Sequence, residues 1–120
     1  MTLRIQGKNM TQRRKTVYIA SPYTNGDVAT NVRNSLLMAD KLLNMGYLPF
    51  PPLLSHFWHF LSPKSYDTWL DWGKEWVLHC DYVLRLPGQS EGADVEVELA
   101  KQHGIRVFYS LEELVLDSLY

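Results

Sequence analysis

The fold is decided by residues 82–104, which read YVLRLPGQSEGADVEVELAKQHG. The apolar run 82–86 predicts a strand that ends at Pro87-Gly88, because these residues favour a turn over a continued strand. A loop of small residues follows, and residues 92–103 predict a helix that Gly104 ends. The start of such a helix offers free backbone N–H groups and the positive end of the helix dipole, which suit an anionic ligand.

The segments that precede this stretch show the same alternation of strand and helix. Residues 16–20 are a β-branched and aromatic run that predicts a buried strand, and the following loop contains Ser21-Pro22 and Asn25-Gly26. From Asp27 to Gly46 the apolar residues recur at helical spacing. The predicted inward face of this helix consists of Val32, Leu36, Ala39 and Leu43. Residues 47–50 predict a short strand that passes into a proline-containing loop.

The middle of the chain is rich in aromatic residues. Residues 51–61 have no convincing period and predict either a short helix or a wall of aromatic side chains over a pocket. Ser62-Pro63 predicts the start of a helix that runs to about residue 79, since serine favours the N-cap and proline the first helical position. We expect Trp69 and Trp76 in the core or at a subunit interface, and Phe57 and Trp58 at the pocket. The full inward stripe of the helix is Tyr66, Trp69, Leu70, Gly73, Trp76, Val77 and Cys80.

A strand over 105–109 and a helix that begins at Ser110 complete a β-α-β-α-β-α-β-α order. This order predicts a single α/β domain of the Rossmann-like or flavodoxin-like kind, with a parallel sheet of about four strands and helices on both faces. In such folds ligands bind at the carboxyl ends of strands, where the strand order reverses. With the order 2-1-3-4, the loops 21–26 and 87–92 meet at that reversal. The sequence therefore predicts a site between these two loops.

Composition narrows the classes of protein. The chain has 120 residues, of which 46% are apolar and 21% charged, and a net charge of -1, which indicates one globular domain and argues against a general nucleic-acid binder. The lone Cys80 excludes a disulfide framework and is expected to be a buried small hydrophobe in a reducing compartment. No apolar run reaches membrane-spanning length and no signal peptide is recognised, so we expect a cytoplasmic protein. Residues 1–15 are interpreted as a flexible basic arm, either for an acidic partner or as a frayed terminus, with Met10 as a later start.

The predicted helix 92–103 carries one carboxylate that differs from its neighbours. Because positions three and four apart share a face, Glu96 lies with Ala93, Leu99 and Ala100, whereas Glu98 lies among charged residues. A carboxylate on an apolar face is poorly solvated, which is unfavourable. Such carboxylates are therefore found mostly at functional sites. Two interpretations of Glu96 stay open on periodicity alone: a carboxylate at an active site, or a surface residue stabilised by the helix dipole.

Four segments of the chain resemble the nucleoside 2-deoxyribosyltransferase superfamily. They are Tyr18-Ile19-Ala20-Ser21-Pro22-Tyr23, Asn31-Val32-Arg33, Cys80-Asp81-Tyr82-Val83-Leu84-Arg85-Leu86-Pro87-Gly88 and Ser90-x-Gly92-Ala93-x-x-Glu96-x-x-x-Ala100. The likeness covers nearly all of residues 16–109 and is strongest to a small phage- and bacteria-borne branch of unknown-function domains. That branch is also similar to the deoxynucleoside 5′-monophosphate N-glycosidases. The resemblance assigns residues 16–120 to one nucleoside 2-deoxyribosyltransferase-like domain.

The resemblance implies a role for each matching residue. Glu96 would attack the anomeric carbon of a deoxyribosyl group and displace the base, as the nucleophile does in retaining glycosidases, and the sugar would then pass to water or to another base. Asp81 would support the site, or, in the simpler interpretation, cap the preceding helix end or tie the strand start. His56 would contact the base, or merely pack among aromatic residues. The implied substrate-binding residues are Ser21, Tyr23, His56, Trp58, Ser90, Gly92 and Ala93, with Ser90 and the N–H groups around Gly92 at a 5′-phosphate or 5′-hydroxyl.

One position departs from the family pattern. The resemblance implies an aspartate eight residues before Asp81, and this chain has Gly73 there. Another group or a neighbouring subunit would have to replace it, or the enzyme is impaired. The leading hypothesis is therefore cleavage of the N-glycosidic bond of a nucleoside or nucleotide. The alternatives are a nucleotide- or phosphate-binding module without catalysis and, ranked lower, glycohydrolysis of a dinucleotide.

The expected partners follow from the same observations. We expect a small nucleoside or nucleotide ligand, no nucleic-acid polymer, no membrane and a homodimer or higher homo-oligomer. No metal-ligand spacing and no dinucleotide or ATP loop is found in the sequence, so no cofactor is predicted.

Overall fold

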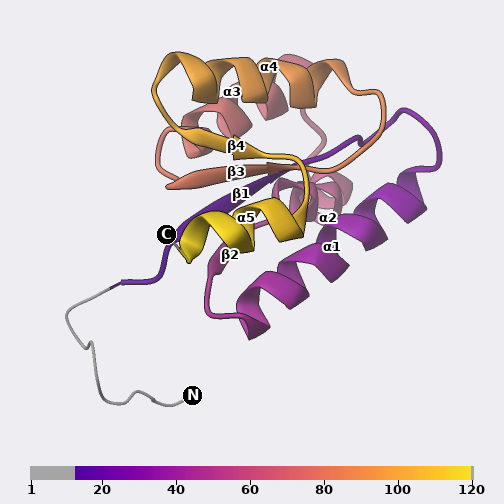
Figure 1. Cartoon of the computed structure of the whole chain (residues 1–120). Helices are drawn as coiled ribbons and strands as arrows, with labels where there is room; N and C mark the ends of the chain where they lie inside the picture. The colour runs from indigo at the N-terminus through magenta and orange to yellow at the C-terminus, as the bar shows by residue number, and fades with distance from the viewer. Residues whose placement is uncertain (1–12, 120) are drawn as a thin grey trace.

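The structure is a computed structural model that describes residues 13–119 (Figure 1). Of the predicted basic arm, residues 1–12 lie outside the described residues. The strands are β1 (Thr16–Ala20), β2 (Leu48–Phe50), β3 (Tyr82–Arg85) and β4 (Arg106–Phe108). The helices are α1 (Val28–Asn44), α2 (Ser55–Leu61), α3 (Tyr66–Val77), α4 (Glu91–Gln102) and α5 (Leu111–Ser118), with the 3₁₀ turn η2 (Pro52–Leu54) before α2.

The strands form one parallel sheet in the order β2-β1-β3-β4, which confirms the predicted α/β architecture and strand order. The two central strands are in register, with Tyr18 paired to Val83 and Ala20 to Arg85. Val17, Tyr18, Ile19 and Ala20 of β1 have no exposed surface, because helices cover both faces of a central parallel strand. Because β1 and β3 are parallel neighbours, the loops that follow them leave the sheet side by side, at its carboxyl end.

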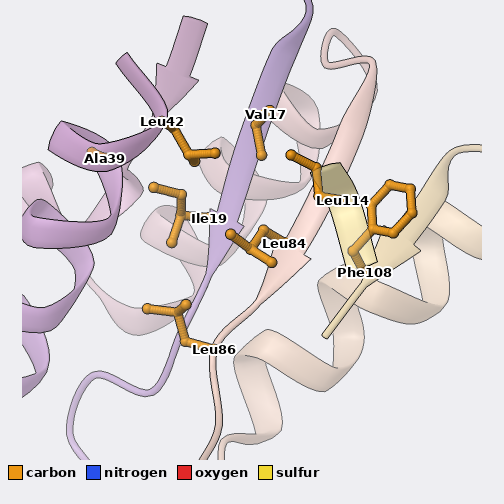
Figure 2. Packing of buried hydrophobic residues seen from close by; sticks show 8 residues of the cluster. All are labelled: Val17, Ile19, Ala39, Leu42, Leu84, Leu86, Phe108 and Leu114. Carbon is orange, nitrogen blue, oxygen red and sulfur yellow. The ribbon is translucent and has the colours of Figure 1, made fainter. Parts of the chain in front are cut away.

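Two separate apolar layers hold the helices to the sheet. On one face of the sheet, α1 and α5 pack against strand side chains. One buried cluster there includes Ile19, Leu42, Leu84 and Leu114 (Figure 2). On the other face, α3 and α4 cover a cluster that includes Tyr18, Val77 and Val97. Figure 1 shows these helix pairs on opposite sides of the sheet. Within residues 13–119, none of the helices has both the length and the apolar character needed to cross a bilayer.

Helix ends follow local sequence signals at three places, of which Ser110 and Gly104 are predicted. Ser90 Oγ accepts a hydrogen bond from Ala93 N at 3.1 Å, and Ser110 Oγ accepts one from Glu113 N at 3.1 Å, so both serines are N-caps. After α4 the chain turns at Gly104, whose φ of +72° is a conformation that residues with a Cβ rarely adopt.

The predicted start of the third helix at Ser62-Pro63 is wrong. The chain forms α2 up to Leu61, and α3 begins only at Tyr66. Ser65 is the N-cap, because its Oγ accepts a hydrogen bond from Thr68 N at 3.1 Å. Two serines three residues apart offer competing caps, and the second one is used.

The inward faces of two helices also differ from the prediction. In α1 the predicted inward residues Val32 and Ala39 are buried, but Leu43 is 46% exposed and its neighbour Leu42 is fully buried instead. In α3 only Gly73 and Val77 of the predicted stripe are buried within the helix. The predicted stripe residues Tyr66 and Trp76 are exposed.

Candidate functional site

A cavity of about 870 Å³ lies beyond the carboxyl ends of β1 and β3, where the strand order reverses. Its walls come from the loop after β1, from η2, from the α2–α3 segment, and from α3 and the start of α4. This is the place that the two small-residue loops predict. The lining includes Tyr18, Ser21, Tyr23, Leu53, His59, Lys64, Tyr66, Trp69, Trp72, Gly73, Ser90, Gly92, Ala93 and Glu96.

Glu96 lies in the second turn of α4 and lines the cavity with a partly buried side chain. Its Oε2 accepts a hydrogen bond from the hydroxyl of Tyr18 at 2.6 Å. Burial raises the pKa of the Glu96 carboxyl to about 7, although the Tyr18 hydrogen bond and the charge of Arg85 act in the opposite direction. Glu96 therefore faces the cavity and is not the surface residue of the second interpretation.

Tyr18 comes from the middle of β1 and has no exposed surface. Burial raises the pKa of its phenol well above the usual value, and the neighbouring Glu96 carboxylate raises it further, so the hydroxyl remains a donor. Its ring stacks on Phe50 with centroids 5.7 Å apart, which fixes its direction. Tyr18 is not among the predicted site residues, because a tyrosine inside an apolar strand usually belongs to the core. The available signal is its alternation with Ile19, which turns Tyr18 toward α3 and α4.

Gly73 of α3 lies directly against this pair. A Cβ at position 73 would be 2.6 Å from Tyr18 Oη and 2.7 Å from Glu96 Oε2, both closer than van der Waals contact allows. The aspartate that the family pattern places here therefore does not fit beside the observed Tyr18–Glu96 hydrogen bond. The absence of a side chain at position 73 allows α3 to pack directly over Tyr18 and Glu96.

The start of α4 contributes Ser90, Gly92 and Ala93 to the cavity. Ser90 Oγ already accepts from Ala93 N, and because no acceptor for its hydroxyl hydrogen is found in residues 13–119, the hydroxyl can donate to a ligand. Gly92 faces α3, since a Cβ there would lie 3.2 Å from Tyr66 Oη. Asp94, in the first turn, is paired with Arg85 at 2.9 Å. The predicted site residues Ser90, Gly92 and Ala93 are thus brought together at the cavity.

The loop after β1 contributes Ser21 and Tyr23, as predicted. Asn31 of α1 holds this loop, because its Nδ2 donates to the carbonyl oxygens of Tyr23 and Asn25, each at 2.9 Å. The Tyr23 hydroxyl forms a 2.6 Å hydrogen bond with His56 Nδ1. His56 does not line the cavity itself; it orients a residue that does.

The aromatic wall of the cavity differs from the predicted one. Trp58 is outside the lining and packs edge-on against Trp69, with ring centroids 5.1 Å apart. Trp69 and Trp72 of α3 line the cavity instead, and so does His59 of α2. Trp69, expected in the core or at a subunit interface, is half-buried and lines the cavity.

Asp81 lies at the opposite end of the strands from the cavity, just before the amino end of β3. Its Oδ2 accepts hydrogen bonds from Thr16 N at 2.8 Å and from Thr16 Oγ1 at 3.0 Å. Asp81 N donates to Thr16 Oγ1 at 2.8 Å in return. Asp81 therefore ties the starts of β1 and β3 together, as its simpler interpretation predicts, and does not contact the cavity.

The charged residues of the lining are Lys64, Glu91, Asp94 and Glu96. In residues 13–119 no group of three or more His, Cys, Asp or Glu side chains has the arrangement of a metal site.

Comparison with known proteins gives one assignment. No curated protein matches the sequence significantly. The model of a family described as a domain of unknown function, DUF7768, matches residues 15–110, and the chain belongs to that family.

Proposed function

We propose that the protein cleaves the N-glycosidic bond of a nucleoside or nucleoside 5′-monophosphate, by hydrolysis or base exchange, with Glu96 as nucleophile. The observation that carries the proposal is the Glu96 carboxyl in the cavity, with a pKa raised to about 7 by burial and one oxygen held by Tyr18 at 2.6 Å. A perturbed carboxyl in a concave site at the strand-order reversal is typical of catalysis. The resemblance to the nucleoside 2-deoxyribosyltransferase superfamily supports the same chemistry.

In the first step, Oε1 of Glu96 attacks C1′ of the sugar. A C1′–O bond forms, the C1′–N bond breaks, and the electron pair leaves with the base, which takes up a proton from solvent. Tyr18 holds Oε2 and keeps the carboxylate aimed during the attack. The ionised carboxylate also stabilises the positive charge that develops on the sugar.

In the second step, water or a second base attacks C1′. The ester bond between C1′ and Glu96 breaks and returns the carboxylate, while the attacking water or base gives up one proton to solvent. Tyr18 donates to Glu96 again as the charge returns. No side chain needs to occupy position 73 in this sequence, since solvent carries both protons.

The proposal also covers the ligand, the compartment and the oligomeric state of the protein. The ligand is a small molecule and no cofactor takes part. The protein acts in the cytoplasm, which the lone, buried Cys80 supports. It works as a homodimer or higher homo-oligomer, which is supported by the strongly exposed Phe60 and Leu61 at the end of α2, 68% and 87% accessible.

The proposal is tested by incubating the protein with a panel of deoxynucleosides and deoxynucleoside monophosphates and measuring free base by chromatography. We expect base release from at least one member, and loss of nearly all of it in Glu96→Ala. The rate of base release should rise with pH as Glu96 ionises. In Tyr18→Phe this rise should occur at higher pH, because the hydrogen bond that lowers the pKa of Glu96 is removed. No release from any member, with Glu96→Ala behaving identically, removes the proposal.

Gly73 favours a second candidate function, a nucleotide- or phosphate-binding module without turnover. A glycine at this position leaves the cavity without the acid that the family pattern provides. Stabilisation of the fold by nucleotides in thermal unfolding, without any product, would support the module. Product formation excludes it.

A further inference from the structure

We propose that His59 is a specificity-determining residue of the cavity: its Nε2–H donates a hydrogen bond to an acceptor atom of the ligand, and for a nucleobase this selects an oxo group over an amino group. The contact is inferred from the structure alone, whereas the identity of the ligand as a nucleobase rests on the proposed function.

The proton of the His59 ring is placed by its neighbours. Trp69 Nε1 donates to His59 Nδ1 at 2.9 Å, and the backbone N of Lys64 donates to the same atom at 3.2 Å. Indole and backbone N–H groups are donors only, so Nδ1 must be the acceptor in both contacts. The ring proton therefore lies on Nε2.

Rotation of the ring would break both contacts, so the tautomer and the orientation of His59 are fixed together. The two donors come from the α2–α3 connection and from α3, and both hold the imidazole at Nδ1. The remaining polar atom, Nε2, has no hydrogen-bond partner among residues 13–119. His59 lines the cavity, and we infer that this unpaired donor is the atom that it offers to a ligand.

At the position of Nε2 the His59–Trp69 pair offers the ligand a donor and no acceptor. Trp69 cannot accept, and its own donor is used by His59. A carbonyl oxygen opposite Nε2 would be paired, whereas an amino group there would set a donor against a donor. Sites that hydrogen-bond one polar group discriminate strongly against the analogue that leaves their own group unpaired. We expect at least about a tenfold preference for the oxo ligand.

Two variants separate this role from the structural role of the ring. In His59→Asn, the amide oxygen lies near the position of Nδ1 and can accept from Trp69, but no donor reaches the position of Nε2. In His59→Gln, the amide lies near the position of Nε2 and can donate, but the acceptor for Trp69 is lost. If His59 only joins α2 to α3, the glutamine variant is the more damaging one. If His59 selects the ligand, the asparagine variant loses the preference and the glutamine variant keeps part of it.

The experiment measures calorimetric Kd values and, separately, base release for two matched pairs, deoxyinosine against deoxyadenosine and deoxyuridine against deoxycytidine. We expect the oxo member of each pair to bind more tightly, with the preference lost in His59→Asn. An unchanged preference in His59→Asn, or no preference in the parent protein, overturns the role of His59 while cleavage still supports the proposed function. Preferential binding that depends on His59 without cleavage supports this role and removes the proposed function. Absence of both binding and cleavage overturns both.

A second measurement does not need a ligand or a folded variant. Nitrogen-15 NMR of the histidine-labelled protein reports which ring nitrogen carries the proton. We expect His59 to be protonated at Nε2 and unprotonated at Nδ1. A proton on Nδ1 overturns the inference.

Discussion

The two ends of the sheet each hold one carboxylate, and folding has opposite effects on them. At the amino end, burial acts to raise the pKa of Asp81, but the Thr16 hydrogen bonds and the nearby Arg13 outweigh it, and the pKa lies below its ordinary value of 3.8. At the carboxyl end, burial dominates, and the pKa of Glu96 rises from 4.5 to about 7. Among residues 13–119, the Glu96 carboxylate accepts one hydrogen bond, from Tyr18.

This difference separates a structural carboxylate from a candidate functional one. Asp81 gains more from its partners than it loses in hydration, so its charge stabilises the fold. Glu96 loses hydration without full compensation, so its charge destabilises the fold unless a ligand completes its surroundings. Stability given up at one residue, beside an open cavity, is what a preorganised site requires.

The largest expected effect comes from Glu96→Gln. The folded pKa of Glu96 is raised, so its contribution to stability is full below pH 4.5 and is lost as the pH rises through about 7. The neutral glutamine avoids this loss and still accepts from Tyr18. We expect the variant to be more stable than the parent by about 3 kcal/mol at about pH 8, and by less than about 1 kcal/mol at about pH 5. Urea unfolding at the two pH values measures the difference.

The comparison of the two pH values is its own control, because packing changes do not depend on pH. Equal changes at both values would mean that Glu96 is fully solvated in the fold and that the contrast with Asp81 does not exist.

The next effect, somewhat smaller, is expected from Gly73→Ala. A Cβ there meets Tyr18 Oη at 2.6 Å and Glu96 Oε2 at 2.7 Å, so the pair must separate or α3 must move. Overpacking of this kind costs about 1–3 kcal/mol, and the better helix propensity of alanine offsets up to about 1 kcal/mol of it. We expect a net loss of about 1–2 kcal/mol in urea unfolding, together with a changed pH dependence.

Gly92→Ala is the matched control, since it is the other glycine within a described helix. Its Cβ would meet the hydroxyl of the exposed Tyr66 at 3.2 Å, and that side chain can move away. Stability should stay the same or rise slightly. A neutral Gly73→Ala would show that α3 has room to withdraw from the Tyr18–Glu96 pair.

Local signals in the sequence predict most of this fold. The apolar strand runs, the caps at Ser90 and Ser110, and the turn at Gly104 act within a few residues, so the alternation of elements and the strand order follow. The failures lie where two local choices compete. Ser62 and Ser65 are both good caps, and Leu42 and Leu43 are neighbours on one helix; the packing of α2, α3 and α1 decides between them.

The site is predictable only in part, because its key contacts span long sequence separations. The face of Glu96 follows from helical spacing, but its partner Tyr18 lies 78 positions away along the chain. The crowding at Gly73 needs α3, β1 and α4 together. His59 of α2 and Trp69 of α3 both line the cavity and share a hydrogen bond, and the periodicity of either helix alone does not encode this contact between them.

The smallest effect is expected from Asp81→Asn, and its sign is opposite to that of Glu96→Gln. The folded pKa of Asp81 is lowered, so its stabilisation is present above pH 3.8 and is lost as the pH falls through the folded pKa. The side chain is a quarter exposed, and its ion pair with Arg13 is a long 3.7 Å, so solvent weakens the effect to about 1 kcal/mol or less at neutral pH. Urea unfolding should show the variant less stable than the parent at about pH 7 and equal to it at about pH 2. Nucleoside binding should be unaffected, because Asp81 lies at the edge of the sheet away from the cavity. A variant that weakened binding would mean that the two ends of the sheet are coupled, and the separation of a structural from a functional carboxylate would not hold.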